Sequence, residues 1–124
     1  MLRILAFTGA LLVLSIGATA SALGQGTMAP ALKGTVGPGF TISLKKAGKS
    51  FRSLRAGTYT ITVSDKASIH NFTLERETKP KIEKHITSTA FRGTKTIKIA
   101  LKKGLWKFYC SVHESIMHGS FRVR

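Results

Sequence analysis

The strongest constraint on the fold is a two-residue alternation of apolar and polar side chains that recurs along most of the chain. In one stretch, Tyr59, Ile61 and Val63 alternate with threonines; comparable stretches lie at 40–45, 72–75, 96–102, 106–110 and 121–124. Because successive side chains of a strand point to opposite faces, each stretch predicts a strand with one buried face. Turn-forming sequences such as KKAGKS, RAGT and SDKAS separate the stretches. The pattern predicts an all-β protein, an antiparallel Greek-key β-sandwich of seven to eight strands. The charged segment 76–85 is expected to be a loop.

The beginning of the chain has the features of an export signal. A short basic start, Met1–Leu2–Arg3, precedes the apolar segment 4–17, and the small residues of ATASA follow it. This order is typical of a secretory signal peptide, here residues 1–22. The apolar segment is shorter than the ~20 residues that a membrane-spanning helix needs, although an uncleaved anchor stays an alternative. We therefore expect a periplasmic or extracellular protein, which is tethered to the membrane if the signal is retained.

Removal of the signal leaves enough chain for one compact domain and too little for two. The Gly, Ala and Pro content of residues 23–33 indicates a flexible leader, so the domain is expected at 34–124 and as a monomer. The formal net charge is +15, with only five acidic residues. Such a charge favours acidic docking surfaces on partner proteins and also membrane surfaces. Most aromatic residues have the inward parity of their strands, so we do not expect nucleic-acid binding.

A group of soft and intermediate ligands lies near the end of the chain. Cys110 is the only cysteine, His113 follows it in a Cys-x2-His pattern, and Met117 follows three residues later. A second histidine, His70, shares the inward parity of the strand at 72–75 and can meet this segment at one end of a sandwich. Thiolate, thioether and imidazole ligands together favour copper over magnesium, calcium or manganese. The candidate metal ligands are therefore His70, Cys110, His113 and Met117.

Three further residues affect this assignment. The amide of Asn71 could tie the two ligand segments together and support the ligands from outside. His85 is a weaker candidate ligand than His70, because its segment is highly charged. His118 follows Met117 directly, but the parity of the last strand points Met117 inward and His118 outward. Methionine is therefore the expected fourth ligand.

Two segments, GTYTITVSDKASIHNFTL at 57–74 and LWKFYCSVHESIMHGSFRV at 105–123, resemble the cupredoxins, a family of small type 1 (blue) copper proteins. The resemblance covers roughly residues 34–124. It implies one Cu(I)/Cu(II) ion with His70, Cys110 and His113 as equatorial ligands and Met117 as the long axial ligand. It also implies that Asn71 latches the ligand loop. Val112 stands where many members of the family carry proline.

The resemblance predicts an exported carrier of single electrons between redox partner proteins. A protein that stores, buffers or delivers copper would use the same residues and is the main alternative. A thiol enzyme built on Cys110 and His113 would need an acidic residue to orient the histidine, and the sequence suggests none. An adhesion-like sandwich without metal would leave the single thiol unexplained. We therefore do not expect an enzyme.

Overall fold

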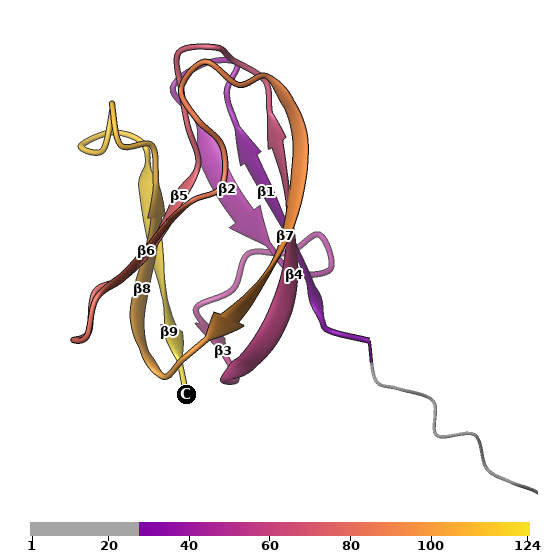
Figure 1. The fold of residues 1–124 in the computed structure, drawn as a ribbon, viewed down its shortest axis with the longest axis vertical. Coiled ribbons are helices and arrows are strands. Elements are labelled where there is room, and N and C mark those ends of the chain that lie inside the picture. The colour runs from indigo at the N-terminus through magenta and orange to yellow at the C-terminus, as the bar shows by residue number, and fades with distance from the viewer. Residues whose placement is uncertain (1–27) are drawn as a thin grey trace, which may run out of the picture.

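The computed structural model describes residues 28–124, which form a β-sandwich of two sheets (Figure 1). The predicted signal peptide at 1–22 and the first part of the predicted leader lie outside the described residues. Nine strands are present in the described part of the chain: β1 (Ala31–Val36), β2 (Ile42–Lys45), β3 (Ser53–Leu54), β4 (Gly57–Asp65), β5 (Thr73–Arg76), β6 (Ile82–His85), β7 (Gly93–Leu101), β8 (Gly104–Tyr109) and β9 (His118–Val123). No helix that could cross a membrane occurs among residues 28–124.

The strand order confirms a β-sandwich and shows that both sheets are mixed. One sheet has the order β2-β1-β4-β7 and the other β3-β9-β8-β5-β6. The predicted antiparallel pairing holds for most neighbouring strands, but β1 pairs with β4 and β3 pairs with β9 in parallel. Alternation of side chains does not report strand direction, so the parallel pairs could not be read from the pattern.

The strand count exceeds the predicted seven to eight, and two predicted boundaries are wrong. The sheet begins at Ala31, so residues 31–33 belong to the sandwich and not to the predicted leader. In the charged segment 76–85, which was expected to be a loop, β6 pairs with β5 as an edge strand. Only Ile82 of this strand is apolar and partly buried, so β6 lacks the alternation on which the prediction rested.

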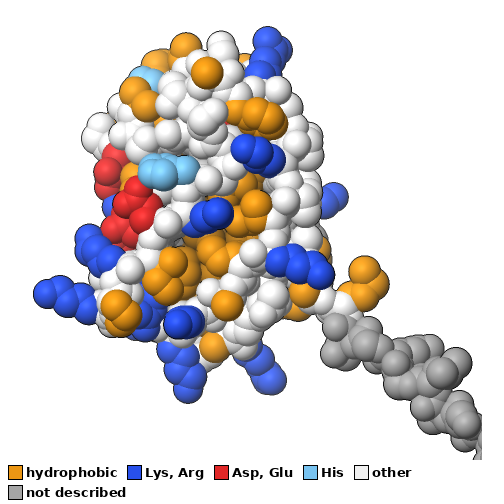
Figure 2. All heavy atoms as spheres, viewed as in Figure 1, with side chains coloured by type: hydrophobic (Ala, Val, Ile, Leu, Met, Phe, Trp, Pro, Cys, Tyr) orange, Lys and Arg blue, Asp and Glu red, His pale blue; other side chains and the backbone are white. Residues whose placement is uncertain are grey.

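The core lies between the sheets and is built from the inward residues of the alternating stretches. The indole of Trp106 is fully buried and stacks on Phe121, and its Nε1–H donates to the carbonyl of Lys102 at 2.8 Å. On the side shown in Figure 2, apolar atoms remain visible between the sheets, and Ile82, Ile97 and Ile99 of the two edge strands β6 and β7 are partly buried. Side chains are therefore more completely buried at the centre of the sandwich than along this side.

The strand registers place the connecting loops at two ends of the sandwich. We define the upper pole by loops 37–41, 66–72, 86–92 and 110–117, and the lower pole by segments 46–52, 55–56, 77–81, 102–103 and 124 (Figure 1). Because β5 and β8 are antiparallel neighbours with Thr73 opposite Tyr109, the segment before β5 and the segment after β8 meet at the upper pole. The predicted ligands lie in these two segments.

Gly119 gives a test of the packing beneath the upper pole. It lies opposite Phe108 in the β8–β9 pairing, and a Cβ atom at this position would come within 2.2 Å of the Phe108 ring. Gly119→Ala should therefore destabilise the protein by roughly 1–3 kcal/mol, the usual cost of overpacking. The measurement is urea unfolding of the metal-free protein.

Gly39→Ala is the matched control, because a Cβ atom at Gly39 would meet no atom within 4 Å. Its unfolding free energy should stay close to that of the parent protein. Equal stabilities for the two variants would show that the ring of Phe108 can move aside.

Candidate metal centre

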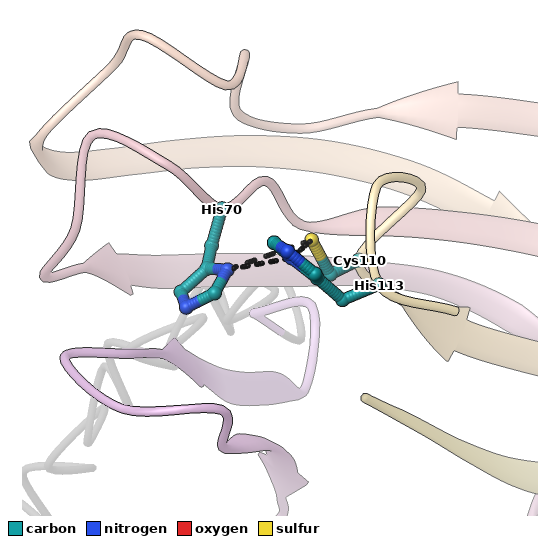
Figure 3. A group of neighbouring side chains, drawn as sticks. All are labelled: His70, Cys110 and His113. Atoms are coloured by element: carbon teal, nitrogen blue, oxygen red, sulfur yellow. Dashed lines mark hydrogen bonds between the residues drawn. The ribbon is translucent and has the colours of Figure 1, made fainter. Parts of the chain in front are cut away.

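Three of the predicted ligands form one cluster at the upper pole (Figure 3). His70 comes from the loop between β4 and β5, and Cys110 and His113 come from the loop between β8 and β9. The Nδ1 atoms of the two histidines are 3.1 Å apart. The Sγ atom of Cys110 is 3.9 Å from Nδ1 of His70 and 3.7 Å from Nδ1 of His113. Two ring nitrogens and one sulfur thus face a common point.

These separations fit three ligands around one metal ion. Nitrogen ligands at about 2.0–2.1 Å and a thiolate at about 2.3 Å from an ion lie about 3.3–3.8 Å apart when the angles are between tetrahedral and trigonal. The observed distances are within a few tenths of an ångström of that range. The Nε2 atom of His70 is buried without a hydrogen-bond partner among the described residues, and Nδ1 faces the cluster. The ring thus offers Nδ1 as its ligand atom.

Asn71 links the two ligand segments, as predicted. Its side-chain oxygen accepts a hydrogen bond from the backbone N–H of Ser111 at 2.8 Å, and its side-chain NH2 donates to the Ser111 hydroxyl at 2.6 Å. The backbone N–H of Asn71 donates to the sulfur of Cys110 at 3.4 Å. Asn71 therefore positions the loop through its side chain and contacts the candidate ligand sulfur through its backbone, as residues that support metal ligands from outside commonly do.

Phe40 is a residue of the site that the sequence analysis missed. Its alternation with Ile42 predicted an inward position, but the ring is 57% exposed and lies edge-on to both histidines, 5.3 Å from His70 and 5.0 Å from His113 between centroids. The turn at Gly37, whose φ of 73° is unfavourable for other residues, places Phe40 outside the strand. The sequence VGPGF could have indicated this turn.

An apolar rim surrounds the partly exposed His113. Its members are exposed apolar residues in three upper-pole loops: Phe40, Ile69, Val112 and Ile116. His70 and Cys110 are fully buried beneath it, so His113 is the ligand candidate nearest to solvent.

Met117 and His118 lie on opposite sides of the chain, as their parity predicted. Met117 is fully buried, its N–H donates to the carbonyl of His113 at 2.9 Å, and its carbonyl accepts from the N–H of Cys110 at 3.0 Å. His118 is exposed, and its Nδ1–H donates to the carbonyl of Glu114 at 2.7 Å. Met117 thus closes the loop that holds the cluster, and His118 does not belong to the cluster.

His85 also lies outside the cluster. It is exposed at the end of β6, where Nε2 lies 2.7 Å from a carboxylate oxygen of Glu83 and Nδ1 lies 2.8 Å from the hydroxyl of Thr73. These contacts explain the residue without a metal.

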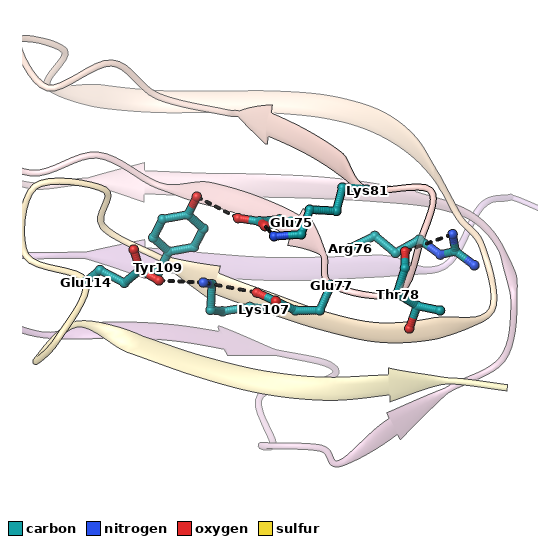
Figure 4. Close-up of polar contacts among 8 residues, drawn as sticks. All are labelled: Glu75, Arg76, Glu77, Thr78, Lys81, Lys107, Tyr109 and Glu114. Carbon is teal, nitrogen blue, oxygen red and sulfur yellow. Dashed lines mark hydrogen bonds and ion pairs between the residues drawn. The ribbon is translucent and has the colours of Figure 1, made fainter.

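Tyr109, next to Cys110, is buried under a polar network on the outer face of β5 and β8 (Figure 4). Its ring points to the outer face of the sheet, but the network covers it. Its hydroxyl donates to Glu75 at 2.9 Å, and the ammonium group of Lys107 lies 4.4 Å from the ring centre. Lys107 in turn forms ion pairs with Glu77 and Glu114. The last of these contacts ties β8 to the loop that holds the cluster.

The network shifts two pKa values. Burial raises the pKa of the Tyr109 hydroxyl, and the neighbouring Glu75 carboxylate raises it further. Burial alone would raise the pKa of Glu75, but hydrogen bonds from Tyr109 and Lys81 outweigh it and hold that pKa below its usual value of 4.5. Tyr109 therefore stays protonated as a donor, and Glu75 stays charged as its acceptor.

Comparisons with known proteins show the fold. No protein-family model and no curated protein matches the chain. The structure is similar to rusticyanin, a copper protein, with a TM-score of 0.55 and 16% identity over 76% of each chain. It is also similar to auracyanin A, a "blue" copper protein from the green thermophilic photosynthetic bacterium Chloroflexus aurantiacus, with a TM-score of 0.51 and 16% identity over 78% of this chain and 100% of that one. The chain has the cupredoxin fold.

The network around Tyr109 predicts a stability loss that depends on pH. Tyr109→Phe removes a buried donor to a carboxylate and should cost about 1–3 kcal/mol at neutral pH. The pKa of Glu75 is lower in the folded protein than in the unfolded one, so the charged carboxylate stabilises the fold at pH values above the unfolded-state pKa. This stabilisation is lost as the pH falls through the folded-state pKa. Tyr109→Phe removes one of the hydrogen bonds that lower the pKa of Glu75. The difference in unfolding free energy between the variant and the parent protein should therefore shrink in acid. The measurement is urea unfolding at neutral pH and at a series of lower pH values that continues below 4.5.

Tyr59→Phe is the control for this experiment. The Tyr59 hydroxyl donates at 2.8 Å to the backbone carbonyl of Arg55, which does not titrate. Its loss should be similar at every pH. A Tyr109→Phe loss that stays constant through acid pH would show that Glu75 is not coupled to the tyrosine.

Proposed function

We propose that this protein binds one copper ion in a type 1 site and carries single electrons between partner proteins outside the cytoplasm. The observation that supports the proposal is the buried cluster of His70, Cys110 and His113, with three facing ligand atoms. Two imidazoles and a thiolate in this arrangement are typical of blue-copper electron-transfer sites. The cupredoxin fold and the sequence features of an exported chain agree with it.

Copper would supply a one-electron Cu(I)/Cu(II) couple, and the protein would supply a rigid set of ligands. The side chain of Asn71 holds the two ligand loops together, and the backbone N–H of Asn71 donates a hydrogen bond to the Cys110 sulfur. Ligands that are held in place need little rearrangement when the charge of the ion changes. Met117 is the proposed fourth, axial ligand, since it is buried on the same loop and a thioether is a weak donor.

The edge of His113 is the proposed point of electron exchange. It is the only one of the three clustered side chains that is partly exposed, and the apolar rim of Phe40, Ile69, Val112 and Ile116 surrounds it. The charged groups in the upper-pole loops are few: Lys66, Arg92 and Glu114. A partner would therefore approach His113 through apolar contact. An acidic docking surface, which the net charge suggested, would find little positive charge here.

Two alternatives are less well supported. A protein that delivers copper needs ligands that a recipient can reach, but His70 and Cys110 are fully buried. A thiol enzyme needs a carboxylate to orient its histidine, and neither His70 nor His113 is hydrogen-bonded to a carboxylate in the described part of the chain. The burial of the thiol also denies it to a substrate.

The copper site predicts an intense visible band from thiolate-to-copper charge transfer. Cys110→Ser should abolish this band in the protein loaded with Cu(II), because no other thiol exists in the chain. The measurement is a visible absorption spectrum after loading with one equivalent of metal. His118→Ala is the control and should keep the band, since His118 is exposed and lies outside the cluster. A serine variant that kept the colour would overturn the assignment.

The axial assignment is tested by the reduction potential. Met117→Leu should keep the visible band but raise the potential by something on the order of 59 mV, a tenfold shift of a one-electron couple, because a donor to Cu(II) is lost. His118→Ala should leave the potential nearly unchanged. If His118→Ala shifted the potential and Met117→Leu did not, the axial ligand would be His118.

A further inference from the structure

The positive charge of this protein is concentrated at one end of the sandwich. The lower-pole segments carry nine Lys and Arg residues and a single acidic one, Glu77, whereas the upper-pole loops carry two basic residues and one acidic. The nine are Lys46, Lys49, Arg52, Arg55, Lys79, Lys81, Lys102, Lys103 and Arg124. On the face shown in Figure 2, most Lys and Arg side chains lie in the lower half of the molecule. Such an asymmetry orients the protein in an electric field or against a charged surface.

A groove of about 810 Å³ opens at this pole. Leu54 and Tyr59 contribute apolar surface to it, and Lys46, Arg55 and Arg124 contribute positive charge. None of its lining residues is acidic. Residues 28–30 also line the groove, so the chain enters the domain here, at the start of β1.

We propose that the lower pole docks on the anionic surface of a lipid bilayer, with the upper pole facing away from the membrane. The basic side chains come from five separate segments and cover a broad end of the domain, which suits an extended negative surface. Lys and Arg near such a surface each contribute to binding, and the contribution falls off within a Debye length.

This orientation agrees with the proposed function but does not depend on it. An acidic redox partner bound at the lower pole would sit at the opposite end of the domain from His113. A bilayer at that pole instead leaves His113 and its apolar rim free to meet a soluble partner. Binding to lipid needs no copper, so the experiment below is done with the metal-free and the copper-loaded protein alike.

The test is co-sedimentation of the purified exported protein with lipid vesicles at low salt. Vesicles in which about one lipid in three is phosphatidylglycerol should bind the protein far more strongly than pure phosphatidylcholine vesicles, and added salt should release it. The first variant replaces Lys46, Arg55, Lys102 and Lys103 with glutamine. These side chains are exposed and make no hydrogen bond or ion pair with other described residues.

The matched control replaces Lys66, Lys84, Arg92 and Lys98 with glutamine, which removes the same charge from the upper pole and the outer faces. Each cationic side chain near an anionic membrane is worth about fivefold in binding. The lower-pole variant should therefore lose at least about 50-fold in binding to anionic vesicles, whereas the control should lose less than about fivefold. Equal losses would mean that only the net charge matters and would overturn the docking surface.

Lysine labelling by an acylating reagent, read by mass spectrometry, checks the orientation. On anionic vesicles Lys46, Lys102 and Lys103 should be protected, and Lys66 and Lys98 should react as in free solution. Protection of Lys66 instead would place the upper pole on the membrane. A protein that bound polyglutamate through the lower pole but did not sediment with anionic vesicles would have an acidic macromolecule as its partner, and the proposal would be wrong.

Discussion

The pairing of β5 with β8 is the interaction on which the candidate site depends. Thr73 lies opposite Tyr109, so His70 comes just before one strand and Cys110 just after its antiparallel neighbour. The two ligand segments thus start from adjacent points of one sheet. A register slip of one residue would move them apart by about 3.4 Å and turn every side chain of the strand to the other face. The positions of the ligand atoms follow from this ladder before any metal is considered.

Several contacts hold this register at the upper pole. The Asn71 side chain bonds to Ser111 on one side of the cluster, and the Cys110 N–H bonds to the Met117 carbonyl on the other. On the outer face of the same sheet, Tyr109 bonds to Glu75 across the β5–β8 pair. The ligand loop is therefore restrained from both faces of the strand that precedes it, as a preorganised metal site requires.

The three candidate ligands that cluster in the structure could be selected from the sequence because their signals are local and chemical. Cys110 and His113 share one loop, and His70 keeps the parity of a strand that alternates clearly. The rest depended on neighbours that the sequence does not reveal. Phe40 leaves its expected face because a turn intervenes, and β6 is a strand because β5 offers it an edge. The parallel pairing of β1 with β4 is likewise a property of the assembled sheet, since strand direction leaves no trace in the alternation.

The separation of charge from the candidate site changes how the net charge should be interpreted. A value of +15 averaged over the chain suggests that any encounter is steered by electrostatics. In the folded protein the lower pole, which carries nine basic residues, is separated from the loop of His113 by the six-residue strand β8. At about 3.3 Å per residue this strand is longer than the screening length of about 10 Å at ordinary ionic strength. The lower pole can therefore respond to anionic surfaces while contact at His113 is governed by the apolar rim. The proposed docking surface and the proposed point of electron exchange thus lie at opposite ends of one small sandwich, so neither competes with the other for the same surface.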